Sequence, residues 1–301
     1  MRYLIFLLSL FLVSSCRSQQ KNELPSNADG NTLLWEISGK DLKKPSYLFG
    51  TFHMMCKDDI RFSDNLRKAL SSSKELMLEM DLDDPSNTLG AIFFINMKNG
   101  KTLKDLYSAD EYKRLEKYFK DSLGTGLVML QRMKPNFLEA MLYPKMMPCK
   151  TMSGVEEELM KLAKTDKKEI TGLETIAFQA SVFDSIPYDT QAKDLLRTID
   201  SIQNYRLYFD TMLHIYKTQQ LSQMETLFEK EPGFEETKDV LLDQRNRNWV
   251  GQLKSLLPKK SIFIAVGAGH LPGDQGMISL LKKEGYTLRP IMNKGVTNVK
   301  D

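Results

Sequence analysis

Apolar positions along this chain follow two different patterns. Short uncharged runs bounded by Gly, Pro or charged residues are typical of buried strands, whereas longer segments with an apolar residue every three or four positions indicate amphipathic helices. Strands are expected at residues 33–37, 46–51, 75–81, 168–173, 261–266 and 286–292. Helices are expected at residues 64–70, 109–119, 136–143, 155–163, 174–183, 188–216, 237–257 and 277–283.

The order of these elements indicates the fold class. A strand, a loop, a helix and a further strand follow one another over residues 261–292, and such an α/β unit implies a sheet that is at least partly parallel. Residues 86–257 are helical over most of their length. We therefore expect one α/β domain over residues 31–301, with a central mixed sheet and the helical region 86–257 covering it. An α+β arrangement is the alternative.

The N-terminal residues differ in character from the rest. Met1-Arg2 precedes an uncharged run, Tyr3 to Val13, that is too short to span a bilayer and is typical of a secretory signal. The following Ser14-Ser15-Cys16 resembles a bacterial lipobox, whose cysteine becomes lipidated. Residues 1–15 are predicted to be a lipoprotein signal peptide and the polar residues 16–30 a flexible tether. The protein is then exported and lipid-anchored to the bacterial cell envelope; an ordinary signal peptide is the alternative.

Composition adds further limits. The formal net charge of +3 implies no nucleic-acid footprint. No later apolar run approaches transmembrane length, which leaves only the lipid to hold the protein at a membrane. In an exported protein the two remaining cysteines, Cys56 and Cys149, can form one intramolecular disulfide, with free buried thiols as the alternative. Nothing in the sequence indicates an oligomeric state.

Two of the predicted strands end in the same motif. Gly50-Thr51-Phe52-His53 and Gly267-Ala268-Gly269-His270 both read Gly-x-x-His, and the chain holds only three histidines. Sites in α/β sheets gather outside the carboxyl ends of strands, and glycine permits tight turns and close approach of the backbone to a ligand. The two histidines therefore mark a candidate site, together with the turn residues Gly50, Thr51, Gly267 and Gly269.

A third strand supplies a carboxylate. With a period of two, Glu79 lies on the face of strand 75–81 opposite its leucines, near the end of the strand. Two imidazoles and a carboxylate suffice to hold a catalytic divalent metal and leave a position for water, so His53, His270 and Glu79 are candidate ligands. The alternative is that both histidines are hydrogen-bonded turn residues. The third histidine, His214, is interpreted as structural or exposed.

Other sites are not indicated by the sequence. There is no HExxH, GxSxG or P-loop motif, and Gly267-Ala268-Gly269 lacks the third glycine of a dinucleotide-binding turn. The helical region is rich in methionine, which is more typical of an adaptable core than of a ligand set; the residues are Met129, Met133, Met141, Met146 and Met147.

Taken together, the motifs resemble those of the TraB/GumN family. The two GxxH motifs, Glu79 on its strand, Thr171-Gly172-Leu173-Glu174-Thr175 and Arg245-Asn246 carry the resemblance, which runs from about residue 33 to 292. That family includes the Tiki metalloproteases and is more distantly similar to erythromycin esterase and ChaN-like proteins. Gly154-Val155-Glu156 departs from the family pattern, which places Asp at the last position, so no role is carried over to Glu156.

The resemblance implies a divalent-metal hydrolase, with a Tiki-like peptidase as the favoured activity and a peptide or small molecule as substrate. The ion would be Mn, Co or Zn, and the catalytic set would comprise Glu79, Glu174, Arg245 and Asn246. Glu174 would act as general base or orient a ligating histidine, and Arg245 would stabilise an oxyanion or bind a substrate carboxylate. The alternative is an ion pair between Glu174 and Arg245.

A competing hypothesis comes from a different class of protein. Paired histidines under a methionine-rich helical cover would also suit a lipid-anchored binding protein without catalytic activity, for haem or another small molecule.

Overall fold

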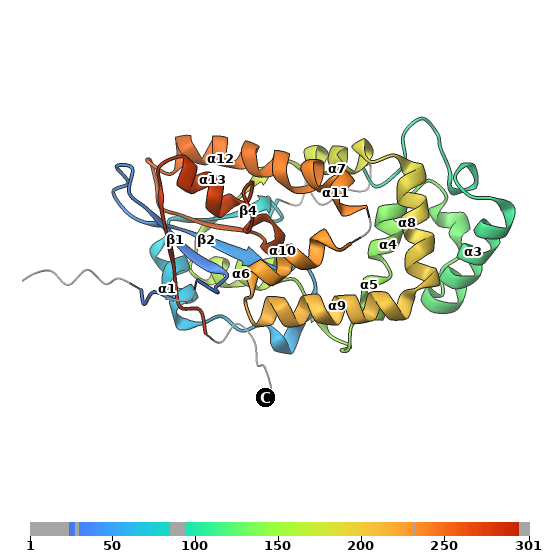
Figure 1. Cartoon of the computed structure of the whole chain (residues 1–301), viewed down its shortest axis with the longest axis horizontal. Coiled ribbons are helices and arrows are strands. Elements are labelled where there is room, and N and C mark those ends of the chain that lie inside the picture. The colour runs from blue at the N-terminus through green and yellow to red at the C-terminus, as the bar shows by residue number, and fades with distance from the viewer. Residues whose placement is uncertain (1–23, 28–29, 85–93, 232, 295–301) are drawn as a thin grey trace, which may run out of the picture.

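The computed structural model describes residues 24–27, 30–84, 94–231 and 233–294 (Figure 1). The predicted signal peptide with Cys16 and most of the predicted tether lie outside these residues. Leu24–Asn27, which the sequence assigns to the tether, lie along the C-terminal segment instead. Ser26 forms a β-bridge with Ile291, and the amide of Asn27 donates to the carbonyl of Pro290 at 2.9 Å.

A mixed six-stranded sheet in the order β6-β4-β7-β2-β1-β8 forms the centre of the fold, which confirms the predicted fold class. Strands β6, β4, β7 and β2 are mutually parallel, and β1 is antiparallel to both of its neighbours. Their bounds are β1 (Leu34–Ser38), β2 (Ser46–Thr51), β4 (Glu75–Met80), β6 (Glu169–Glu174), β7 (Ile262–Gly267) and β8 (Thr287–Pro290). A two-stranded ribbon pairs β3 (Met55–Cys56) with β5 (Met152–Ser153).

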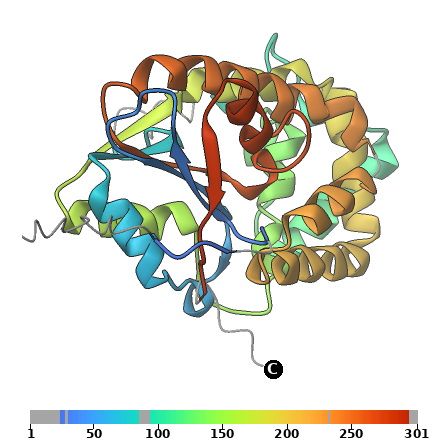
Figure 2. The same cartoon turned by 60° about the vertical axis from the view of Figure 1, so that its left-hand side comes forward.

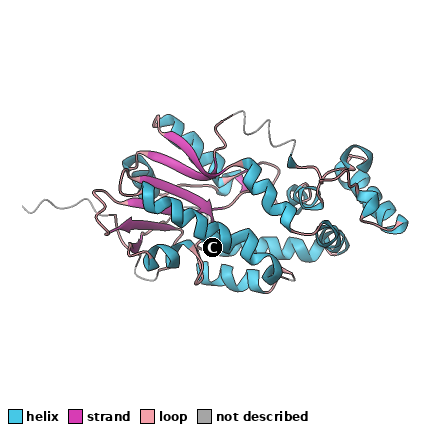
Figure 3. Cartoon of the chain, turned by 90° about the horizontal axis from the view of Figure 1, so that it is seen from above, coloured by secondary structure: helices cyan, strands magenta, loops and turns pink. Residues whose placement is uncertain are grey.

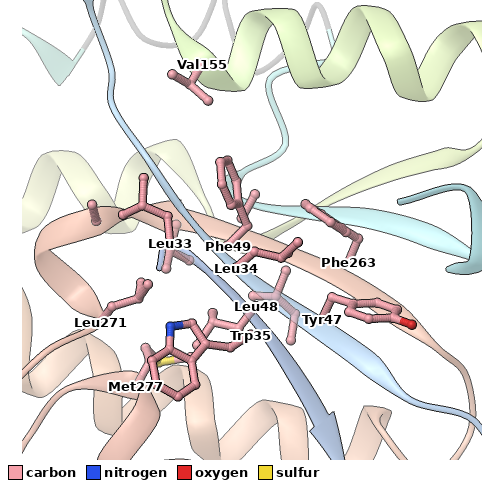
Figure 4. Packing of buried hydrophobic residues seen from close by; sticks show 14 of the residues in the cluster. Leu33, Leu34, Trp35, Tyr47, Leu48, Phe49, Val155, Phe263, Leu271 and Met277 are labelled. Carbon is pink, nitrogen blue, oxygen red and sulfur yellow. The ribbon is translucent and has the colours of Figure 1, made fainter. Parts of the chain in front are cut away.

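Helices cover both faces of this sheet, which is why β2 and β7 are buried along nearly their whole length and lack polar alternation. Helices α1 (Asp64–Ser72) and α6 (Val155–Thr165) lie on one face, and α12 (Gln244–Leu256) and α13 (Met277–Lys283) on the other (Figures 1 and 2). In Figure 4, Val155 of α6 and Met277 of α13 lie on opposite sides of the sheet, with the side chains of Phe49 and Leu48 between them.

A second hydrophobic cluster lies in the helical region, which extends beyond the sheet (Figures 1 and 3). Its main contributors are α3 (Ala109–Leu123), α4 (Pro135–Ala140) and α8 (Tyr188–Asp200). The remaining helices of this region are α5 (Tyr143–Met146), α7 (Ile176–Ser185), α9 (Ile202–Lys217), α10 (Leu221–Glu229) and α11 (Phe234–Lys238). A capping box opens α3, in which the side chains of Ser108 and Glu111 each bind the other's backbone amide.

Several predicted helix bounds are wrong. The helix expected at 188–216 is two helices, α8 and α9, which meet at Ser201, where the backbone leaves helical geometry (φ −125°, ψ 31°). The helix expected at 237–257 contains a π-helical segment, Asp239–Asp243, before α12. The helix expected at 136–143 is shorter, since α4 ends at Ala140, and Pro144 lies within the first turn of α5, where its missing N–H costs nothing.

Within the described residues no helix is long and apolar enough to cross a membrane.

Candidate active site

The site lies where four parallel strands end side by side. The sheet register places Thr51 of β2 opposite Gly267 of β7, and Leu78 of β4 opposite Ala265 of β7. Met80 lies opposite Glu174 on β6. Side chains that follow these positions therefore share the carboxyl edge of the sheet, where loops can build a site without disturbing the strands.

Three of the predicted residues converge on a recess beside Gly267. A methyl group placed on Gly267 would lie 3.2 Å from Oε1 of Glu79, 3.6 Å from Nε2 of His53 and 3.7 Å from Cδ2 of His270. The side chains of Glu79 and His270 also approach each other directly, with Nε2 of His270 3.8 Å from Oε1 of Glu79. The absent side chain at position 267 leaves these three groups facing one small volume.

Glu79 is held as a carboxylate despite its burial. Its Oε1 accepts a hydrogen bond from the amide of Gly267 at 2.7 Å, and its Oε2 accepts one from Arg245 Nη2 at 2.6 Å. The amide of Gln179 donates to the same oxygen at 3.3 Å. Burial acts to raise the pKa of Glu79, but the charges of Arg245 and His53 and the hydrogen bond from the Gly267 amide outweigh it and hold that pKa well below its usual value.

His53 forms the solvent-facing side of the site, since 73% of its side-chain surface is exposed. Its Nδ1 lies 2.7 Å from Oε1 of Glu156, which also accepts a hydrogen bond from the hydroxyl of Thr51 at 2.6 Å. The negative charge of Glu156 raises the pKa of His53 to about 9, against the opposing effect of desolvation. A backbone hydrogen bond next to the short ribbon helps to hold this pair together: the amide of Val155 donates to the carbonyl of Phe52.

His270, by contrast, is buried and neutral. Its Nδ1 lies 2.7 Å from Oδ1 of Asn246, whose Nδ2 donates to the carbonyl of Gln275 at 2.9 Å. That orientation makes Oδ1 the acceptor, so the ring proton sits on Nδ1 and the lone pair on Nε2. The ring packs against Trp249 with 4.4 Å between centroids. Burial lowers the pKa of His270 to about 3.

Arg245 uses all five of its N–H donors within the protein. Nε and Nη2 contact the carboxylate of Glu174, and the second proton of Nη2 serves Glu79. Nη1 donates to the carbonyl of Leu241 at 3.1 Å and to Nε2 of His270 at 3.2 Å. With only 8% of its side chain exposed, Arg245 has no donor left for a substrate.

These contacts bear on the roles proposed for Glu174 and Arg245. Both oxygens of Glu174 accept from Arg245, and Oε1 also accepts from the indole N–H of Trp249 at 2.9 Å. A carboxylate so occupied is a poor general base, and an arginine without a free donor cannot clamp an oxyanion. The geometry favours the alternative, a buried ion pair that fixes α12 against β6 and orients Glu79 and His270.

The fit of this cluster to a divalent ion can be judged from its donors and its charge. In the described part of the chain, no three His, Cys, Asp or Glu side chains stand close enough together to hold a metal as they are. The donor atoms nevertheless suit a divalent metal ion, because Nε2 of both histidines and Oε1 of Glu79 face the recess. Three carboxylates, Glu79, Glu156 and Glu174, outnumber the two cationic groups of the site, the Arg245 guanidinium and the His53 imidazolium. These residues therefore fit a divalent cation that takes the place of the Arg245 Nη1 contact to Nε2 of His270.

Several contacts at the site were not anticipated from the sequence. Glu156, given no role because it departs from the expected Asp, is the carboxylate partner of His53. Gln179 and Trp249 contact Glu79 and Glu174 respectively. The Gly154-Val155-Glu156 segment directly after a short strand was the available signal for Glu156. For Gln179 and Trp249 no local motif exists.

The structure also shows the surroundings of the other residues singled out in the sequence. The hydroxyl of Tyr216 donates to the carbonyl of Gly50 at 3.1 Å, and Gly269 lies against the ring of Phe228. Cys56 and Cys149 form a disulfide, three residues beyond His53. His214 is exposed on α9, as expected. Of the methionines assigned to the core, Met146 and Met147 are buried, but Met129 is 87% exposed.

A haem-binding role finds no support in this geometry. His270 is buried, and its ring packs against Trp249 with 4.4 Å between centroids. A bare ion needs only the Nη1 contact of Arg245 to open, whereas a porphyrin would also need the packing around Trp249 to move.

The chain is similar in sequence to proteins of one known family. A family model described as the TraB/PrgY/gumN family matches residues 33–290. The chain is 23% identical to metalloprotease TIKI2 of Danio rerio over 95% of its own length and 67% of the relative's. It is 24% identical to the metalloprotease TIKI homolog of Amphimedon queenslandica, with 94% and 66% covered, and 23% identical to human metalloprotease TIKI1, with 87% and 62% covered. It thus spans about two thirds of the length of these relatives. No solved structure gives a significant match.

Proposed function

This chain belongs to the TraB/PrgY/gumN family, and we propose that it is a divalent-metal-dependent hydrolase with peptidase activity. The observation that carries the proposal is the convergence of His53, Glu79 and His270 on the recess beside Gly267. The names of its relatives, all metalloproteases, support the same reaction class. Mn, Co and Zn are the candidate ions.

His53, Glu79 and His270 would hold the ion, which when bound would lower the pKa of a coordinated water and polarise a substrate carbonyl. Hydrogen bonds within the chain orient the two histidines and fix which ring nitrogen would face the ion. Glu156 holds one proton of His53 on Nδ1, so that Nε2, once it gives up its own proton to solvent, is the nitrogen that would face the ion. Asn246 likewise holds the ring proton of His270 on Nδ1. Such partners orient a ligating histidine and raise its basicity.

Arg245 and Glu174 set the electrostatics of the site. Arg245 keeps Glu79 ionised and aims its Oε1 toward the recess, and Glu174 fixes the guanidinium through both carboxylate oxygens. To release Nε2 of His270, Arg245 needs to give up only its Nη1 contact, since its remaining contacts to Glu174 and Glu79 involve Nε and Nη2. The buried side chains exclude water from one side of the site, and the exposed His53 leaves the other side open to a substrate.

Peptide cleavage can be tested with the purified chain and a mixture of unstructured peptides. We expect cleavage that disappears with a chelator and returns with Mn²⁺, Co²⁺ or Zn²⁺. The Glu79→Gln variant should lose at least a hundredfold in rate, and His214→Ala should behave as the unchanged chain. Chelator-resistant cleavage, or full activity in Glu79→Gln, would refute the proposal.

We further propose that the protein is exported and anchored to the bacterial cell envelope through a lipid on Cys16. The lipobox-like residues before Cys16 support this. In cells grown with labelled palmitate, Cys16→Ser should abolish labelling of the protein. Retained label in that variant would contradict the anchor.

A further inference from the structure

Lysines stand directly before each of the four parallel strands. Because β6, β4, β7 and β2 are adjacent and parallel, these lysines share the amino edge of the sheet, opposite the candidate active site. The blue turn between β1 and β2, at the left of Figure 1, belongs to this edge. We name the set the lysine edge; its members are Lys43, Lys44, Lys74, Lys167, Lys168, Lys259 and Lys260.

Two of the seven lysines have a structural task. Lys260 pairs with the buried Glu75, and Lys168 donates to the carbonyls of Ser71 and Ser73 at 2.9 and 2.7 Å. Helices α1, α6 and α12 end at the same edge, and cations near helix C-termini are favourable. Stabilisation of the fold therefore accounts for part of this charge.

The other five lysines have no such task. Lys43, Lys44, Lys74, Lys167 and Lys259 are exposed, and their ammonium groups form neither an ion pair nor a hydrogen bond with any described residue. Asp41 and Asp166 are acidic residues of the same turns, and the exposed Glu169 begins β6 directly after Lys168. Positive charge thus exceeds negative charge along the edge and is not neutralised by the chain itself.

The edge also has a hollow that suits an anion. A cavity of about 410 Å³ is lined by Lys43, Lys44, Lys74, Lys259 and Lys260. Two hydroxyl-bearing residues, Ser72 and Ser261, and the apolar Leu257 and Pro258 complete the lining, which includes no carboxylate-bearing residue. Several ammonium groups around one hollow fit a phosphate, and the adjoining Lys167 extends the charge along the sheet.

We propose that the lysine edge docks on anionic phospholipid headgroups at a membrane surface. Neighbouring strands are about 4.8 Å apart, so the four strand ends spread the lysines over roughly 15 Å, which matches a surface of many phosphates better than one free ion. Each lysine near such a surface strengthens binding by about fivefold. This contact adds to the predicted lipid anchor, does not depend on the proposed hydrolase activity, and turns the carboxyl-edge site away from the bilayer.

The proposal predicts a specific pattern of lysine protection. The full chain would be mixed with vesicles of phosphatidylcholine, with or without phosphatidylglycerol, and its lysines acetylated and mapped by mass spectrometry. We expect Lys43, Lys44, Lys74 and Lys259 to be labelled at least fivefold less with phosphatidylglycerol present, and Lys113 and Lys120 on α3 equally in both. High salt should remove the protection. Equal labelling with both vesicle types would overturn the proposal.

Charge variants give an independent test. Replacing Lys43, Lys44, Lys74 and Lys259 together with Gln should weaken the added affinity for phosphatidylglycerol vesicles at least tenfold, with thermal unfolding unchanged. A control that replaces Lys101, Lys113, Lys120 and Lys150 with Gln removes the same net charge elsewhere and should bind as the unchanged chain. If both variants weaken equally, only net charge matters and the edge is not a docking site. If millimolar inorganic phosphate, added at constant ionic strength, prevents the protein from binding the vesicles, the edge is a site for a free anion, and this result would also overturn the proposal.

Discussion

Nη1 of Arg245 lies 3.2 Å from Nε2 of His270, the ring atom through which that histidine would bind a metal. A buried cation therefore satisfies the lone pair that a divalent ion would use. Because Arg245 also contacts Glu79 and Glu174, the guanidinium holds the site together in the absence of an ion. Arginine and ion compete for the same group.

Replacing Arg245 tests this competition. The Arg245→Met variant leaves Glu79 and Glu174 as unpaired buried charges, which typically costs about 3–5 kcal/mol of stability in the metal-free protein. It should also bind Mn²⁺ or Zn²⁺ at least tenfold more tightly, so that saturating metal restores much of the loss in thermal unfolding. Arg247→Met, on the solvent side of the same helix, is the control and should change neither quantity. Weaker metal binding in Arg245→Met would mean that the positioning of Glu79 by the arginine outweighs any competition with the ion, and would contradict the competition.

The pair formed by His53 and Glu156 predicts a pH dependence in the metal-free protein. Folding raises the pKa of His53 from 6.5 to about 9, so the folded state binds the proton more tightly than the unfolded state. The resulting stabilisation is fully present below pH 6.5 and is lost as the pH rises through 9. In urea titrations, the free energy of unfolding should be lower at pH 9.5 than at pH 6.5, and this difference should disappear in His53→Gln.

Nuclear magnetic resonance of the imidazole protons checks the same pair directly, because the chain holds only three histidines. In Glu156→Gln the pKa of His53 should fall toward 6.5, with the exposed His214 as an internal reference. An unchanged His53 titration in that variant would show that Glu156 is not its partner in solution.

The absence of a side chain at position 267 is predicted to be required for metal binding. The backbone at Gly267 has an ordinary φ of −49°, so alanine causes no strain there, but its methyl group would lie 3.2 Å from Oε1 of Glu79 and 3.6 Å from Nε2 of His53. Gly267→Ala should therefore fold and lose at least tenfold in metal affinity. Gly251→Ala on α12 meets no atom within 4 Å and should bind metal normally while gaining up to about 1 kcal/mol of stability. Equal metal affinity in both variants would place the ion elsewhere.

The sequence was sufficient to locate the six strands of the sheet, and to bring the candidate site residues to one edge of it, for a physical reason. A strand covered on both faces must be uncharged, and β2 and β7 are recognisable as such runs, each followed by Gly-x-x-His. Parallel strands also bring their carboxyl ends to one edge, so the approach of His53 to His270 follows from the fold class. The position of Glu79 beside them follows in the same way, because it lies near the carboxyl end of the parallel strand β4.

Contacts between residues distant in sequence could not be predicted in this way. Arg245 reaches Glu79, 166 positions earlier, because α12 packs over the sheet, and nothing around either residue encodes that choice. The helix break at Ser201 depends likewise on tertiary packing, since the amphipathic pattern of 188–216 continues through it. Glu156 was given no role because the family pattern places Asp there. Its position at the start of α6, after the short strand β5 that pairs with β3 beyond His53, was the signal that it could reach that histidine.

The disulfide is predicted to stabilise the site as well as the fold. Cys56 and Cys149 are 93 residues apart in sequence and join the segment after His53 to the segment before Glu156. Loss of such a bridge typically costs about 2–5 kcal/mol. The Cys56→Ala/Cys149→Ala variant should unfold at lower denaturant concentration, and its His53 pKa should move toward 6.5. Mass spectrometry without reduction should find the linked peptides in the unchanged chain; two free thiols there would contradict the prediction.

Calorimetric titration of the chelator-stripped chain with Mn²⁺, Co²⁺ and Zn²⁺ is the most direct test of metal binding by His53, Glu79 and His270. We expect one ion per chain for at least one of these metals, and a loss of at least a hundredfold in affinity in His53→Ala, His270→Ala or Glu79→Gln. Residues that hold one ion fail together, so combining His53→Ala with Glu79→Gln should weaken binding little further. His214→Ala should bind as the unchanged chain. No stoichiometric binding by the unchanged chain, or undiminished binding in all three variants, would contradict the assignment of His53, Glu79 and His270 as the metal site.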